Sequence, residues 1–187
     1  QHTKHFQGRV CLIPPPENGN ASAPTIQAPA WRGERILEPE AIYQVYFHGP
    51  AFQVLDGVES DGARVVGKFR AGLPPMTGTE KQTLVAPRLI ELCLQTAGVW
   101  EIGKTGVLAL PTAIERLIVH GIPGNGESLY AEIEPKQNGA DLAFDARVVD
   151  EKGNVYLELQ GYRTARLPSP IDQEQAATDR GKAYSEG

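Results

Sequence analysis

The chain has 187 residues, of which 41% are hydrophobic and 22% are charged, as in an ordinary globular domain. Its formal net charge of −5 argues against a general nucleic-acid binder, because such proteins are usually basic. No apolar run approaches the length of a membrane span, and no signal-peptide core follows the first residues.

The cysteine content predicts neither disulfides nor a metal site. Cys11 and Cys93 are too few for a disulfide framework, and no His/Cys cluster has the spacing of zinc ligands. We therefore expect no metal and a reducing, cytoplasmic location. The only methionine is Met76, so we expect the chain to be a piece of a longer protein.

The two ends of the chain differ from its middle. Residues 1–13 include a stretch at 5–13 that predicts a β-strand. Residues 14–38 are rich in Pro, Ala, Ser and Asn and predict a linker or an extended surface crossing. The folded domain is expected over residues 39–167. The polar residues 168–187 predict an exit linker, with a short helix at 171–180.

The first half of the folded domain carries helix and hairpin signals. Residues 39–46 predict a short helix that begins at a proline. Residues 52–59 and 63–71 alternate between apolar and polar, and the Ser-Asp-Gly between them is typical of a hairpin turn. Residues 86–101 predict the one substantial helix, because Pro87 suits a first helical position and apolar residues follow at helical spacing.

Four strand-like runs follow the long helix. Alternation within the later runs indicates one buried face per strand, and glycine-containing turns separate the four runs. The runs are residues 111–120, 127–135, 140–150 and 154–166. Together these elements predict an α+β architecture, in which one long helix is wrapped by a curved antiparallel β-sheet with a meander after the helix.

Two segments carry a family resemblance. Residues 46–53 (YFHGPAFQ) resemble the Tyr-Gly-Pro-x-Phe signature that opens the second hotdog of polyketide synthase dehydratase domains, with His48 just before Gly-Pro. Residues 86–95 (APRLIELCLQ) resemble the Pro-Ala-Leu-Leu-Asp-x-x-x-Gln helix start of the same family. The resemblance covers about residues 40–166, extends to polyunsaturated-fatty-acid-type synthases, and implies a hotdog fold.

The chain departs from the family pattern in two places. The acid of the helix motif is Asp in the family and is Glu91 here, which is similar to stand-alone bacterial 3-hydroxyacyl-carrier-protein dehydratases. The base of the family lies in a His-x-x-x-Gly-x-x-x-x-Pro motif of the first hotdog, and the segment from His120 has Leu129 in place of the proline. The resemblance therefore implies the C-terminal hotdog half, with residues 1–13 as the last strand of a preceding hotdog.

The resemblance implies a lyase activity. The expected reaction is dehydration of carrier-protein-bound 3-hydroxyacyl thioesters to enoyl thioesters, and the chain is expected to be inert without its upstream half. No cofactor is expected beyond the phosphopantetheine of an acyl carrier protein, which carries the substrate. The expected partners are that carrier and either the missing N-terminal hotdog or a second copy, with no nucleic acid and no membrane. Basic side chains are expected mainly on the surface, where some could meet the acidic carrier: Arg64, Lys68, Arg70, Lys81 and Arg88.

The resemblance also assigns roles within the site. Glu91 would be the general acid, and Gln95 would hold its carboxyl group or the leaving water. A carboxylic acid in an apolar tunnel can stay protonated at neutral pH, because desolvation disfavours the charged form. From the residues alone, spacing shows only that positions i and i+4 of a helix are neighbours. A substrate-binding role is assigned to four residues of the loop at 48–52, the Gly-Pro loop: His48, Gly49, Pro50 and Phe52.

Other interpretations of the same residues stay open. A Glu-x-x-x-Gln pair on a helix is commonly a solvated surface pair, His48 could simply cap a turn, and Tyr43 and Tyr46 are expected to serve packing. At the level of the whole chain, the alternatives are a non-catalytic hotdog that has a structural or carrier-binding role and a hotdog thioesterase. Product analysis would separate loss of water from thioester hydrolysis.

Overall fold

The computed structural model describes most of the folded domain and parts of the segment before it. The described residues are 7–12, 23–29, 31–32, 37–60, 64–76, 86–124, 126–138 and 141–166. Their elements in chain order are α1 (Pro39–Val45), the 3-10 helix η1 (Pro50–Phe52), β1 (Leu55–Ser60), β2 (Val65–Phe69), α2 (Pro87–Thr105), β3 (Ala109–Ala113), β4 (Arg116–Val119), β5 (Leu129–Asn138), β6 (Asp141–Asp150) and β7 (Val155–Arg166). The predicted exit linker and its short helix lie outside the described residues.

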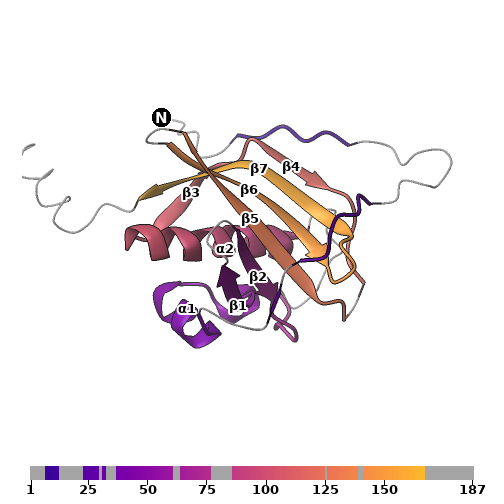
Figure 1. The fold of residues 1–187 in the computed structure, drawn as a ribbon, viewed down its shortest axis with the longest axis horizontal. Coiled ribbons are helices and arrows are strands. Elements are labelled where there is room, and N and C mark those ends of the chain that lie inside the picture. The colour runs from indigo at the N-terminus through magenta and orange to yellow at the C-terminus, as the bar shows by residue number, and fades with distance from the viewer. Residues whose placement is uncertain are drawn as a thin grey trace, which may run out of the picture.

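A single curved antiparallel sheet holds all the described strands. Its order is β1-β2-β5-β6-β7-β3, and β4 also pairs with β7. Figure 1 shows α2 lying along one face of this sheet, with α1 near the β1–β2 end. The main core lies between α2 and the inner face of the sheet and includes Leu92, Cys93, Phe144 and Leu157. The predicted architecture of one long helix wrapped by an antiparallel sheet is confirmed.

Local signals explain where α2 begins and ends. Pro87 occupies the first turn, where its missing N–H costs nothing. Gly106 ends the helix in the left-handed conformation (φ 71°), and its N–H donates to the carbonyl of Ile102 over 2.7 Å. The helix therefore continues to Thr105, four residues beyond the predicted end at 101.

Two glycines let α2 approach its neighbours closely. A Cβ atom on Gly67 of β2 would lie 2.0 Å from Oγ1 of Thr96, so the helix rests directly on the strand. A Cβ atom on Gly98 would lie 2.3 Å from the hydroxyl of Tyr46, which is buried just after α1. These approaches fix α2 relative to both the sheet and the segment that follows α1.

The prediction of one strand over residues 111–120 is wrong, because this run forms two strands. Both β3 and β4 pair with β7, so only β5, β6 and β7 form a meander. The register of β3 shifts between Pro111 and Ala113, where the proline has no N–H to donate. On β7, Gly161 has φ 63° and donates its N–H to the Asp145 carboxylate, so the partner strand is also irregular.

The N-terminal segments differ from the prediction in part. Residues 7–12 are exposed and form no strand, and the rest of the predicted strand at 5–13 lies outside the described residues. Within the predicted linker, Thr25 forms an antiparallel bridge with Asn154, and Ile26 and Trp31 pack on the outer face of the sheet, away from α2. The described part of residues 14–38 is thus an extended surface crossing.

The close approach of Tyr46 to Gly98 leads to a prediction about stability. Gly98→Ala should lower the free energy of unfolding by about 1–3 kcal/mol, because the added methyl group overlaps the buried Tyr46 hydroxyl. The control is Gly103→Ala on the same helix, where an added Cβ meets nothing within 4 Å. That change should raise the free energy of unfolding by about 0.5 kcal/mol. Chemical denaturation of the two variants measures both values, and equal effects would contradict the close approach.

Candidate active site

Glu91 and Gln95 lie one turn apart on α2, and their side chains are in direct contact. The amide nitrogen Nε2 of Gln95 donates to Oε1 of Glu91 over 3.0 Å. Gln95 is only 2% exposed, whereas the Glu91 side chain is 21% exposed. The expected contact between neighbours is therefore present, and the interpretation as a solvated surface pair does not fit the burial of Gln95.

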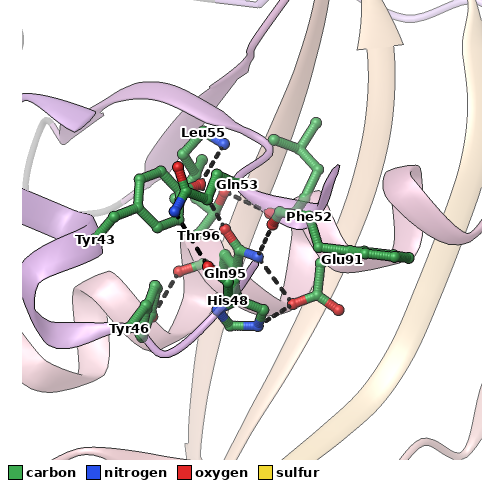
Figure 2. A network of polar contacts seen from close by, with 10 residues as sticks. Tyr43, Tyr46, His48, Phe52, Gln53, Leu55, Glu91, Gln95 and Thr96 are labelled. Carbon is green, nitrogen blue, oxygen red and sulfur yellow. Dashed lines mark hydrogen bonds and ion pairs between the residues drawn. The ribbon is translucent and has the colours of Figure 1, made fainter. Parts of the chain in front are cut away.

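The Gly-Pro loop lies over this turn of α2, as Figure 2 shows. Its 3-10 turn begins at Pro50, and the N–H of Phe52 donates to the carbonyl of Gly49 over 2.9 Å. The carbonyl of Phe52 then accepts a hydrogen bond of 2.8 Å from Nε2 of Gln95. The structure thus brings the backbone of the loop to the site. Gly49 has φ −67° and open space at its Cβ position, so sterics do not require glycine there.

His48 contacts the carboxyl group of Glu91 directly. Its Nε2 lies 2.9 Å from Oε1 of Glu91 and its ring stacks against the exposed Phe47. Its Nδ1 is buried and has no hydrogen-bond partner among the described residues, so the ring does not cap a turn. A proton on Nδ1 would be a buried donor without an acceptor, which favours the tautomer with its proton on Nε2. Nε2–H therefore donates to Glu91.

Tyr43 and Tyr46 have polar roles in the site, whereas the sequence predicted only packing for them. The hydroxyl of Tyr43 donates to Oε1 of Gln95 over 2.8 Å and accepts the N–H of Leu55 over 2.7 Å. The hydroxyl of Tyr46 donates to the backbone carbonyl of Gln95 over 3.0 Å. Burial raises the pKa of Tyr43 to about 12. Tyr43 and Tyr46 are three residues apart in the predicted helix 39–46, and residues at this spacing lie on the same face of a helix. This spacing was the one signal in the sequence that both side chains could face α2.

Together these contacts hold one oxygen of a carboxyl group, while the other has no hydrogen-bond partner among the described residues. Oε1 of Glu91 faces two donors, Gln95 and His48, while Oε2 has no hydrogen-bond partner among the described residues. A carboxyl group held in this way can offer a proton at Oε2 to a bound oxygen atom. Such a proton donor could act as a general acid toward a bound substrate.

Of the basic residues expected at the surface, Arg88 has a structural role. Its Nε donates to the carbonyl of Ala51 over 3.0 Å, and its guanidinium also donates to the carbonyl of Pro74. Lys68 lies 3.5 Å from a carboxylate oxygen of Asp56. Lys81 lies outside the described residues. Arg88 therefore ties the Gly-Pro loop to the start of α2.

The part of the chain that the structure describes contains no group of three or more His, Cys, Asp or Glu side chains able to hold a metal ion. Within the same residues, no helix is both long and apolar enough to cross a membrane.

Comparison with known proteins identifies the family. A sequence model of the family described as polyketide synthase dehydratase N-terminal domain matches residues 24–174. The chain therefore belongs to the polyketide synthase dehydratase family. It is also 24% identical over 154 residues to one of the polypeptides of the polyunsaturated fatty acid synthase of Thraustochytrium sp., and this match covers 78% of the chain and 5% of that polypeptide.

Solved dehydratase structures confirm the predicted hotdog-type fold. A trans-AT polyketide synthase dehydratase domain from Brevibacillus brevis matches with a TM-score of 0.59 and 20% identity, over 76% of this chain and 55% of that one. The CurK dehydratase, as an inactive variant with one Asp replaced by Asn, matches with a TM-score of 0.57 and 21% identity, over 73% of this chain and 50% of that one. The chain thus spans about half the length of these domains.

The two contacts of Arg88 make a second stability prediction. Arg88→Met keeps the apolar stem but removes both donors, so it should lower the free energy of unfolding by about 1–2 kcal/mol. Arg116→Met, at an exposed position of β4, is the matched control and should change it by less than about 0.5 kcal/mol. The measurement is urea denaturation. If Arg88→Met leaves the free energy of unfolding unchanged, the guanidinium does not anchor the Gly-Pro loop.

Proposed function

We propose that this chain is one half of a dehydratase domain that removes water from carrier-protein-bound 3-hydroxyacyl thioesters, with Glu91 as the general acid. The observation that carries the proposal is the Glu91 carboxyl group, which is held at Oε1 by two donors of the same chain and has no partner at Oε2 among the described residues. Membership of the dehydratase family supports it. The inactivity of the CurK variant with Asp replaced by Asn shows that one acidic residue matters in that enzyme.

The proposed reaction balances without a cofactor. A base removes the α-proton, the α,β double bond forms, and the β-hydroxyl leaves with the proton from Glu91 as water. Gln95 and His48 hold the carboxyl group, and they stabilise the carboxylate that remains, since both donate to Oε1. The resemblance places the base in the first hotdog, so we assign it to the other half of the domain.

The proposed partners follow from this chemistry. An acyl carrier protein would deliver the substrate on its phosphopantetheine arm, and the other half of the domain would complete the site. We assign the chain to the C-terminal half because the Gly-Pro loop and the α2 motif both resemble the second hotdog. The family model carries the description of an N-terminal domain, so this assignment rests on the two motifs alone.

The acid role predicts the effect of one isosteric change. Glu91→Gln, made in the complete dehydratase domain, should lower dehydration of a carrier-bound 3-hydroxyacyl substrate by about 10²-fold or more, since the amide cannot donate the acid proton. Glu91→Asp should be milder, because only reach is lost. The measurement is formation of the enoyl product by mass spectrometry, which also separates water loss from thioester hydrolysis.

The matched control for this experiment is Glu101→Gln. Glu101 is a buried glutamate of the same helix, and its carboxylate accepts hydrogen bonds from Thr164 at 2.8 and 3.0 Å. Turnover of this control should stay within about twofold, because it lies outside the proposed acid site. Near-normal turnover of Glu91→Gln would remove the acid role and favour a non-catalytic hotdog. Hydrolysed thioester in place of enoyl product would favour a thioesterase.

A further inference from the structure

We infer that Tyr43 is a positioning residue of this site: its hydroxyl fixes the amide of Gln95 so that the acid proton of Glu91 is held on Oε2. The inference deepens the proposed function and rests on Glu91 being the general acid. It depends on the direction of each hydrogen bond in the network of Figure 2, taken in order from Leu55 to Glu91.

The hydrogen bond between Tyr43 and Gln95 can run in one direction only. The backbone N–H of Leu55 donates to the Tyr43 oxygen over 2.7 Å, and a phenol has a single hydrogen of its own. That hydrogen must go to the second partner, Oε1 of Gln95, at 2.8 Å. Burial raises the pKa of Tyr43 to about 12, so the hydroxyl keeps its hydrogen throughout the range of ordinary assays.

The orientation of the Gln95 amide follows from this donor. With Oε1 facing Tyr43, Nε2 faces the opposite side, where its two hydrogens meet the carbonyl of Phe52 at 2.8 Å and Oε1 of Glu91 at 3.0 Å. A rotated amide would turn its oxygen toward the Phe52 carbonyl and the Glu91 carboxylate, and these three acceptors would repel one another. The donor hydroxyl of Tyr43 and the acceptor oxygens of Phe52 and Glu91 therefore select the observed orientation of the amide together.

The amide orientation in turn decides which oxygen of Glu91 carries the acid proton. Oε1 accepts from Gln95 and from Nε2 of His48, which lies 2.9 Å away, so both of its lone pairs are engaged. The proton of the neutral acid is then left to Oε2, which has no hydrogen-bond partner among the described residues. From Oε2 the proton can pass to a leaving hydroxyl group.

Loss of the Tyr43 hydroxyl should weaken this arrangement. The oxygen of the Gln95 amide would lose its donor, so the amide would no longer be held firmly against Oε1 of Glu91 and the acid proton could reside on Oε1, where it is not offered to the substrate. The carboxylate form of Glu91 would then lose a donor that stabilises it relative to the neutral acid. Catalysis should therefore slow, and the alkaline limb of the pH–rate profile should move upward.

The experiment uses Tyr43→Phe in the complete dehydratase domain with a carrier-bound 3-hydroxyacyl substrate. We expect kcat to fall about tenfold, KM to stay within about twofold, and the alkaline limb of kcat to move upward by about one pH unit. Tyr130→Phe is the matched control, because its hydroxyl bonds Glu151 on the outer face of the sheet. The control should change neither kcat nor the alkaline limb of its pH dependence.

A second variant separates positioning from a general structural effect. Gln95→Met removes the amide itself, so its alkaline limb should also move upward, and Tyr43→Phe combined with Gln95→Met should lose no further activity beyond Gln95→Met. Thermal unfolding of each variant confirms that the domain is folded in the assay. If Tyr43→Phe unfolds, the test is the pH dependence of kcat for Gln95→Met. An alkaline limb that does not move in this variant contradicts the inference.

The outcomes also distinguish this inference from the proposed function. Normal turnover of Glu91→Gln would overturn the acid role itself. If Glu91→Gln is inactive while Tyr43→Phe keeps a normal rate and limb, the acid role stands and the positioning role of Tyr43 is wrong. An additive loss in the double variant would likewise contradict action through Gln95.

Discussion

The burial of one primary amide constrains the arrangement of the whole site. Gln95 is 2% exposed on a helix face that otherwise packs against the apolar core. A buried polar group without a partner costs about 1–3 kcal/mol, so every donor and acceptor of this side chain needs a partner. The partners come from three elements: Tyr43 in α1, Phe52 in η1 and Glu91 in α2. Satisfying one amide therefore holds these elements in a single geometry.

The close approach of α2 to its surroundings makes this geometry possible. Without a side chain at Gly67, the helix rests on β2 at Thr96, and without one at Gly98 the Tyr46 ring reaches the helix backbone. The Tyr46 hydroxyl bonds the carbonyl of Gln95 there. A helix kept farther away by larger side chains would leave the phenol groups too distant to bond the Gln95 turn. Packing and polar contacts thus depend on each other.

The family and the site point to the same chemistry. The chain belongs to the polyketide synthase dehydratase family, and its hotdog-type fold places a carboxyl group on the long helix beneath the Gly-Pro loop. Glu91 stands where the family motif has Asp, and His48 from the Gly-Pro loop donates to its carboxyl group. The chain spans about half of the solved domains, and under the proposed function the other half supplies the base.

The sequence by itself determined what local signals encode. Pro87 and apolar spacing predicted α2, alternation predicted β5 to β7, and helical spacing predicted the contact between Glu91 and Gln95. Only the tertiary structure decided that β3 and β4 pair with β7, that His48 bonds Glu91, and that Tyr43 bonds Gln95. These contacts join residues tens of positions apart, which side-chain periodicity does not relate. They form only where the curvature of the sheet and the approach of α2 bring the partners within hydrogen-bond distance.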